Sequence, residues 1–217
     1  MKNTIKNIFI ILFCIGGIMN AKDLQPIRLL KPALENDKLF MQVITERKSS
    51  RDFSDRELSL QDLSNCIWCA NGINRLEDGK RTSPSAMNKQ DIDVYAVLKQ
   101  GIFLYDAVKH ELIPVVSGDY RKNTGMQDWV SIAPLNIIYV SDLSKFSFTK
   151  EREAQVMTAA IDAGHCSQNV YLYGAAANLA VVVRTSIDKT KMAEILKLRP
   201  EQLIIAAQTV GFHKQVK

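Results

Sequence analysis

The stretch from Glu151 to Leu179 constrains the fold more than any other part of this sequence. It is long, rich in alanine and free of proline. Alanine has the highest helix propensity, and a proline would break a helix interior. The sequence therefore predicts one long helix here, and its many small apolar residues predict that this helix is mostly buried.

Three shorter helices are also predicted. In the first, Asp37–Arg47, apolar pairs recur one turn apart. Ser59 can cap the second, with Asp62 three residues later in a capping-box arrangement, and Asn71-Gly72 suits a left-handed end. Asp188 can cap the third, which runs through Leu196.

Apolar runs between turn residues predict strands. These runs are Val94–Leu98, Gly101–Tyr105, Glu111–Val116, Ile132–Val140 and Leu203–Val210, with a brief extended piece at Val181–Val183. The polar stretch from Ile73 to Gln90 is expected to be a loop. Because helices and strands mix without strict alternation, we expect a single α+β domain.

Composition narrows the class of protein. Hydrophobic residues make up 47% of the chain and charged residues 24%, as in soluble globular proteins. These values exclude a disordered chain, a collagen-like fibre and a disulfide-dense small domain. The formal net charge is +5, but the basic residues are scattered, so nucleic-acid binding is not indicated.

The first 21 residues have the pattern of a secretory signal peptide. Lys2 and Lys6 precede the apolar run Ile8–Ile15, and Ala21 offers a small residue for cleavage. The run is shorter than the 20 or so residues that span a bilayer, and an uncleaved anchor is the alternative. We therefore expect an exported, periplasmic protein whose mature domain covers residues 22–217, with no other membrane contact.

Cys66 and Cys69 form a C-x-x-C sequence that allows two interpretations. It lies beside an apolar stripe at helical spacing, formed by Leu60, Leu63, Ile67 and Ala70. This context favours buried cysteines that pack in a helix. A disulfide or redox pair is the alternative.

The histidines do not predict a catalytic or metal centre. His165 and Cys166 are adjacent, but neighbours on a helix point about 100° apart and do not face each other. This favours helix packing over the alternative of a base and a nucleophile. His110 and His213 lack partners at metal-ligand spacing, so no metal site is predicted.

Two polar segments could bind a ligand. Arg47–Arg51, with sequence RKSSR, places three cations and two hydroxyls where an anion could bind, although a solvated basic loop would look the same. In Arg81–Asn88, Pro84 fixes a turn among small residues, so that a flat ligand could lie against the backbone. An ordinary surface loop is the alternative for this second segment.

Taken together, the segments resemble a known family. RKSSRDF, LSNCIWCANGINR, GKRTSPSAMN, GIFLYDAVKHEL, AGHCSQNVYLYGAAANLAVVV and AAQTVGF follow one another between Asp37 and Phe212. In this order and spacing they are similar to the nitroreductase family of FMN-dependent flavoproteins, and most of all to its branch of azoline (thiazole/oxazole) oxidases.

The resemblance implies a fold and a cofactor site. The fold would be a three-layer α+β fold with a central mixed or antiparallel sheet, in a homodimer with one FMN at each of two interface sites. Arg47, Lys48 and Ser49 would bind the phosphate and ribityl chain, and Arg51 would face the N1/O2 edge of the flavin ring.

The other implied contacts come from three further places. Pro84, Ser85, Ala86 and Asn88 would reach the ring and ribityl chain from the partner subunit. The backbone of Val182, Val183 and Arg184 would lie near N5 and O4, although Asn178-Leu179-Ala180 replaces the glycine-rich turn frequent in the family. Lys214 would complete the phosphate site.

The expected function is that of an FMN-dependent oxidoreductase. Hydride would pass to or from flavin N5 by ping-pong kinetics, with nitroaromatic, quinone-like or other conjugated substrates and NAD(P)H as a candidate donor. NAD(P)H is scarce outside the cytoplasm, so an exported enzyme would use another donor or act as an oxidase. The alternatives are a non-catalytic flavin-binding electron carrier and an exported binding protein that has lost FMN.

Overall fold

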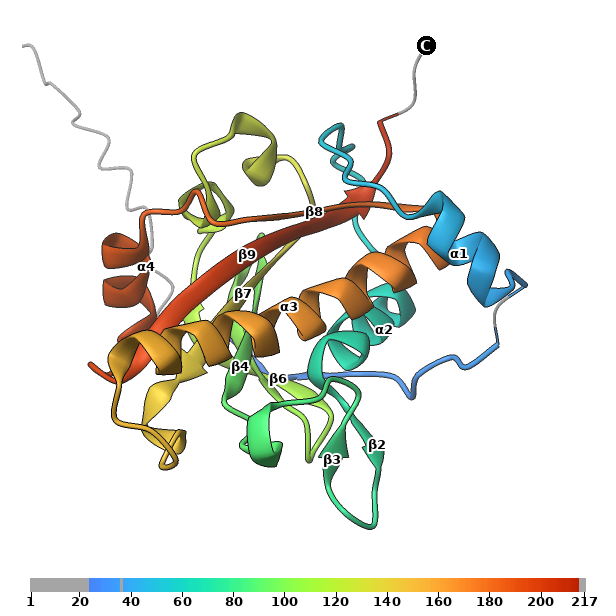
Figure 1. Ribbon diagram of the computed structural model, residues 1–217. Helices are drawn as coiled ribbons and strands as arrows, with labels where there is room; N and C mark the ends of the chain where they lie inside the picture. Colours follow the sequence, from blue (N-terminus) through green and yellow to red (C-terminus); the bar gives the residue numbers. More distant parts are fainter. Residues whose placement is uncertain (1–23, 36, 215–217) are drawn as a thin grey trace, which may run out of the picture.

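The computed structural model describes residues 24–35 and 37–214 and is built around one antiparallel sheet (Figure 1). The strand order is β1-β6-β5-β4-β7-β9-β8, and each neighbouring pair is antiparallel. The strands are β1 (Ile27–Arg28), β4 (Ile92–Leu98), β5 (Gly101–Asp106), β6 (Glu111–Ser117), β7 (Leu135–Asp142), β8 (Leu179–Arg184) and β9 (Gln202–Phe212). A separate small ladder pairs β2 (Ile73–Arg75) with β3 (Lys80–Arg81).

Helices cover both faces of the sheet. They are α1 (Phe40–Glu46), α2 (Leu60–Asn71), α3 (Arg152–Ala176) and α4 (Lys189–Leu196). The long α3 crosses one face next to α2, and α4 packs on the opposite face (Figure 1). This is the three-layer α+β arrangement that the sequence predicts.

The central strands are apolar along their length because both of their faces are covered. In β4, Val94 and Ala96 pack in the cluster that contains α2 and α3, whereas Tyr95 and Val97 pack against α4. Successive side chains of a strand point to opposite faces, so this alternation follows from the pleat. β7 is buried throughout and forms the centre of the domain.

The predicted helix caps are largely confirmed. Ser59 Oγ accepts the backbone N–H of Asp62 at the start of α2, and Asp188 does the same for Lys191 at the start of α4. The left-handed end predicted at Gly72 is wrong, because its φ is −73°. Glycine is required there for a different reason: a Cβ would lie 2.2 Å from Cδ1 of Trp68.

Other boundaries shift by a few residues. α3 ends at Ala176, before the predicted Leu179, because Asn178 adopts a φ of 55° and turns the chain into β8. The strand predicted from Ile132 begins at Leu135, after a short 3-10 turn. The expected loop from Ile73 to Gln90 contains the β2–β3 ladder, and the last strand continues past Gly211 to Phe212.

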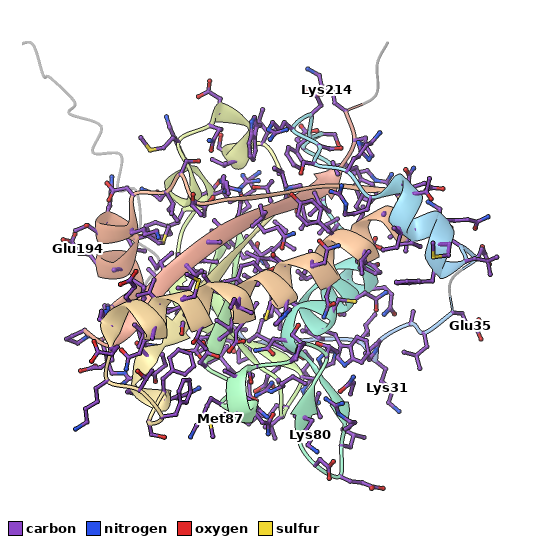
Figure 2. All side chains as sticks on the ribbon, viewed as in Figure 1. Lys31, Glu35, Lys80, Met87, Glu194 and Lys214 are labelled. Carbon is purple, nitrogen blue, oxygen red and sulfur yellow. The ribbon has the colours of Figure 1, made fainter. Side chains whose placement is uncertain are left out.

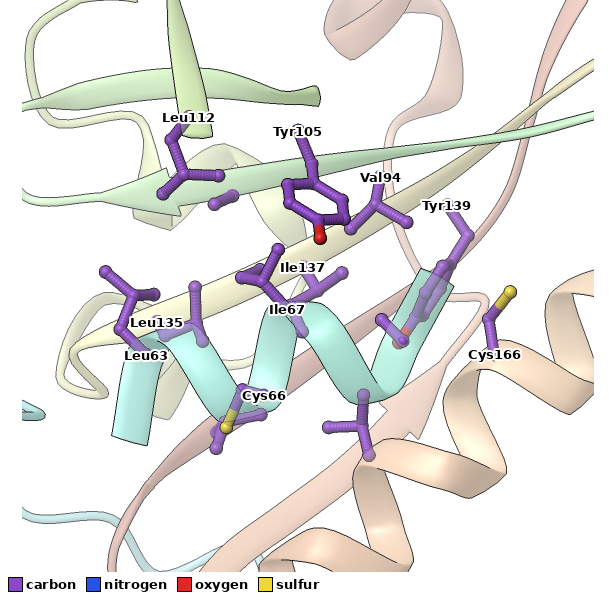
Figure 3. Packing of buried hydrophobic residues seen from close by; sticks show 14 of the residues in the cluster. Leu63, Cys66, Ile67, Val94, Tyr105, Leu112, Leu135, Ile137, Tyr139 and Cys166 are labelled. Atoms are coloured by element: carbon purple, nitrogen blue, oxygen red, sulfur yellow. The ribbon is translucent and has the colours of Figure 1, made fainter. Parts of the chain in front are cut away.

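The cysteines in the described part of the chain are free thiols. Cys66 on α2 and Cys166 on α3 lie among the apolar side chains between these helices and the sheet (Figure 3). Burial raises the pKa of the Cys66 thiol well above its usual value and the pKa values of Cys69 and Cys166 to about 12. This placement supports the helix-packing interpretation of the C-x-x-C sequence.

The predicted signal peptide, residues 1–21, lies outside the described residues and stays a prediction. Among residues 24–35 and 37–214, no helix has the length and apolar character needed to cross a membrane.

Candidate functional site

The basic segment Arg47–Arg51 leaves α1 and runs along the outer edge of the sheet. The N–H of Ser50 donates to the carbonyl of Val181 at 2.9 Å. β8 is the last strand of the sheet, so this edge has no further strand to pair with it. The segment therefore partly covers an edge whose remaining backbone groups can meet a ligand.

Tyr171 of α3 ties this segment to β8. Its hydroxyl accepts the N–H of Val183 at 2.8 Å and lies 2.8 Å from Ser49 Oγ. The guanidinium of Arg47 lies 5.5 Å from the centre of the Tyr171 ring, within cation–π range. Tyr171 thus joins three residues that the sequence predicted for one site: Arg47, Ser49 and Val183.

The carboxyl end of the chain meets the same segment. Phe53 pairs with His213 in an isolated bridge, and the N–H of Lys214 donates to the carbonyl of Asp52 at 3.2 Å. Burial, with the charge of Lys48, lowers the pKa of His213. The predicted Lys214 therefore lies beside the basic segment, in a positively charged region.

Two adjoining cavities open in this region. One of about 300 Å³ lies between the end of α1, the end of α3 and β8, and its lining includes Lys48, Tyr171 and Val181. The other, of about 510 Å³, is lined by Ser54, Arg56, Asn178, Phe212 and His213. Asn178 and His213 line both, so the two cavities adjoin.

The segment Pro84–Asn88 packs against α3 at a different point from the basic segment. The N–H of Ala86 donates to Asp162 Oδ2 at 3.0 Å. Asp162 precedes Tyr171 by nine residues (171 − 162), or about 13.5 Å along the helix axis. Figure 2 places Met87 and Lys214 at opposite sides of the molecule. Within one chain, the structure does not bring the two predicted segments together.

The backbone of this second segment is unusual. Met87 and Asn88 both have left-handed φ values, 49° and 55°, and Asn tolerates this conformation better than most residues. Ser85 Oγ accepts the N–H of Gln90 at 2.9 Å. Pro84 and Asn88 are exposed, whereas Ser85 and Ala86 are half-buried, so the segment presents small side chains and backbone to the surface.

The side chain of Arg184 points into the interior. Its guanidinium donates to Thr209, Asn136 and Thr124 and lies over the Trp129 ring. Burial lowers its pKa to about 10. This leaves only the backbone of Arg184 for the predicted site; of its neighbours, Val182 is buried and Val183 is half-buried.

The structure does not bring His165 and Cys166 together as a base and a nucleophile. His165 is exposed and Cys166 is buried, so they do not face each other. Among the residues that the structure describes, no group of three His, Cys, Asp or Glu could hold a metal ion.

Comparison with known proteins identifies the family. Residues 44–212 match the sequence profile of the nitroreductase family. The chain belongs to the nitroreductase family. This membership makes it an oxidoreductase of the nitroreductase type.

Individual relatives agree with this assignment. A candidate nitroreductase of Ralstonia eutropha JMP134 has 34% identity and a TM-score of 0.82, over 88% of this chain and 90% of its own. A candidate nitroreductase of Methanocaldococcus jannaschii is 23% identical over 80% of this chain and 91% of its own. A chain of the E. coli microcin synthetase McbBCD complex shares the fold, with 17% identity and a TM-score of 0.66 over 87% of this chain and 79% of its own.

Proposed function

We propose that this protein is an FMN-dependent oxidoreductase acting on nitroaromatic, quinone-like or other conjugated small molecules. One observation carries the proposal: Tyr171 fixes a segment rich in cations and hydroxyls along the outer edge of β8. Such an edge, beside basic side chains and two cavities, suits a ligand that is flat at one end and anionic at the other.

The residues present fit FMN. Arg47, Lys48, Ser49 and Lys214 supply the charged and neutral donors that a phosphate needs, and the positive charge near His213 points the same way. Adjoining cavities of about 300 and 510 Å³ fall within the range of small-molecule sites. The outer edge of β8 offers backbone groups rather than bulky side chains to the ring.

A second copy of the chain would complete the site. The Pro84–Asn88 segment lies too far along α3 to reach the basic segment of its own chain, so we assign it to the partner's cofactor. Exposed apolar side chains on α3 support a homodimer, since Met157 is 61% and Ile161 53% exposed. Further exposed apolar residues lie at the start of α1 and within it: Leu39, Phe40, Met41 and Ile44.

The chain itself would bind and orient rather than transfer protons. When bound, FMN supplies hydride chemistry at N5. Arg51 is exposed beside the site, where its charge would stabilise negative charge at the N1/O2 edge. The backbone of Val182–Arg184 would line one side of the ring and leave the other open, so that donor and acceptor use one face in turn.

The proposal also covers the electron donor and the branch of the nitroreductase family to which the protein belongs. NAD(P)H is the donor we propose for a protein that stays in the cytoplasm. If residues 1–21 direct export to the periplasm, another donor or an oxidase reaction replaces it. The likeness to the microcin synthetase chain is one of fold alone, so the azoline-oxidase branch rests on the sequence motifs.

The decisive experiment is an absorbance spectrum of the purified protein, followed by NADPH and then a nitroaromatic. A flavin band that bleaches and recovers supports the enzyme. A flavin band that responds to neither compound supports an electron carrier with other partners. A protein that stays colourless after incubation with FMN refutes the proposal and supports a binding protein that has lost its cofactor.

A further inference from the structure

Two buried acids lie beneath the small-residue segment Ser85–Asn88. Asp91, just before β4, is fully buried, and Asp162 of α3 is 3% exposed. Asp162 Oδ2 accepts the N–H of Ala86 at 3.0 Å. Asp162 is therefore the side chain that fixes this segment onto α3.

Asp91, the second acid of the pair, is hydrogen-bonded through one of its two carboxyl oxygens. Its Oδ2 accepts the hydroxyl of Ser141 at 2.6 Å. Its Oδ1 is buried and has no hydrogen-bond partner in residues 24–35 and 37–214. Asp162 is close enough for a side-chain hydrogen bond to Asp91, which forms only when one of the two acids carries a proton. Burial, and next the adjacent Asp162, raise the pKa of Asp91 to about 7 in spite of the Ser141 bond. A protonated Asp91 becomes a donor, with the Asp162 carboxylate as its acceptor.

We propose that Asp162 is a positioning residue for the Ser85–Asn88 segment, and that a proton on Asp91 holds Asp162 in place. The hydrogen bonds then run from Ser141 to Asp91, from Asp91 to Asp162, and from Ala86 to Asp162. The inference rests on the proposed function, because it gives Ser85–Asn88 a part in holding FMN.

Loss of the proton would weaken this arrangement. Two carboxylates would face each other in a site removed from water, where like charges repel strongly. Asp162 could then relieve the repulsion only by moving, and the Ala86 bond would loosen. FMN affinity should therefore fall as the pH rises through the pKa of Asp91.

Other charged groups surround the pair and have to be controlled. On α3, His165 Nδ1 lies 4.0 Å from Asp162 Oδ1, and Cys166 stays neutral because burial raises its pKa to about 12. Further out are Lys145, which donates to the Gln90 carbonyl, Lys89, which donates to Ser147, Asp93 on β4, and the Asp142–Arg199 ion pair. His165 is the imidazole among them, so H165Q is the background control.

The first test compares D162A with D162N. FMN affinity is measured by quenching of flavin fluorescence, and hydrogen exchange of the Ala86 amide is measured in flavin-free protein. D162A should bind FMN roughly ten- to a hundredfold more weakly and exchange Ala86 faster, because a charged hydrogen bond is lost. D162N should retain most of the affinity, since its amide oxygen can accept from Ala86 while its NH2 donates to Asp91.

The second test isolates the proton on Asp91. D91N keeps an acceptor for Ser141 and supplies a permanent N–H donor to Asp162. Between pH 5.5 and 8.5, wild-type affinity should decline relative to D91N, and D91N should match the wild type at the acid end. The phosphate of FMN titrates too, but its contribution is the same in both proteins.

Three outcomes overturn the inference. They are a folded D162A protein with unchanged Ala86 exchange, a D162N protein as impaired as D162A, and a D91N protein with the wild-type pH dependence. If D162A does not fold, D162N and D91N decide the matter. A wild type that binds no FMN at any pH overturns the proposed function instead, while Ala86 exchange still tests the role of Asp162.

Discussion

The hydroxyl of Tyr171 accepts the backbone N–H of Val183 at 2.8 Å, and it lies equally close to Ser49 Oγ. One side chain of α3 therefore links the edge strand of the sheet to the basic segment Arg47–Arg51. The phenol satisfies a backbone donor that an edge strand would otherwise leave to water. Together with the bond from the Ser50 N–H to the Val181 carbonyl, this oxygen sets the position of the segment relative to the strand, and with it the shape of the proposed cofactor site.

Tyr171→Phe should therefore weaken FMN binding without unfolding the protein. The variant keeps the ring under Arg47 and removes two neutral hydrogen bonds, each worth about 0.5–1.5 kcal/mol. We expect a loss of affinity of roughly five- to a hundredfold, measured by flavin fluorescence titration.

Tyr173→Phe is the matched control for this substitution. The Tyr173 hydroxyl donates to Asp62 and accepts from Asn65, away from the basic segment. Its FMN affinity should stay near that of the wild type. Equal losses in the two variants would contradict a special role for Tyr171.

Ile161→Asp should separate the proposed homodimer and abolish FMN binding together. Ile161 is 53% exposed on α3, and a carboxylate buried in an apolar interface without a partner is strongly unfavourable. Sedimentation velocity and flavin absorbance should show a colourless monomer at micromolar concentration. The control is Val108→Asp, at a residue 81% exposed in the β5–β6 turn. A monomeric Ile161→Asp protein that still binds FMN tightly would refute an interface site.

The sequence predicts the framework of this fold because local signals decide it. Ser59 and Asp188 cap their helices as expected, since a hydroxyl or carboxylate reaches only its own first turn. Apolar runs such as Val94–Leu98 become strands buried on both faces. The end of α2 is different: Gly72 is required by the approach of the Trp68 ring, which no residue pair in the sequence reveals.

The candidate site is only partly predictable, because some of its contacts form only through tertiary packing. Arg47, Ser49 and Val183 follow from family motifs, and the structure places them together. Tyr171 occupies a helix position that periodicity assigns to the core, and its bond to Val183 depends on how α3 packs against β8. Asp162 did leave a signal, since an acid stands out in a buried, alanine-rich helix.

Arg51→Ala should change the reduction potential of bound FMN more than its affinity. Arg51 is exposed at the end of the basic segment, and in the proposed site Arg47 and Lys48 would still bind the phosphate. In the proposed site Arg51 faces N1, and losing that cation would destabilise the reduced, negatively charged flavin. The midpoint potential should therefore fall by roughly 30 mV, the equivalent of about 1.4 kcal/mol for two electrons.

Arg47→Ala serves as the contrasting variant. It should weaken binding by about ten- to a hundredfold through loss of a charged hydrogen bond to the phosphate. Arg28→Ala, on β1 at the opposite edge of the sheet, should change neither quantity. An unchanged midpoint potential in Arg51→Ala would refute the proposed position of this residue beside the flavin ring.

The thiols should be inert in the folded protein. Burial raises the pKa values of Cys69 and Cys166 to about 12 and that of Cys66 well above its usual value. Almost none of these thiols is therefore ionised at pH 8, and only the thiolate attacks a disulfide reagent. We expect Cys66, Cys69 and Cys166 to react with Ellman's reagent at the rate of unfolding, and all three to react at once in guanidinium. The titration uses protein without residues 1–21, which contain Cys14. Reaction in the folded state, or one reactive thiol in denaturant before reduction and three after it, would instead favour the redox interpretation of Cys66 and Cys69.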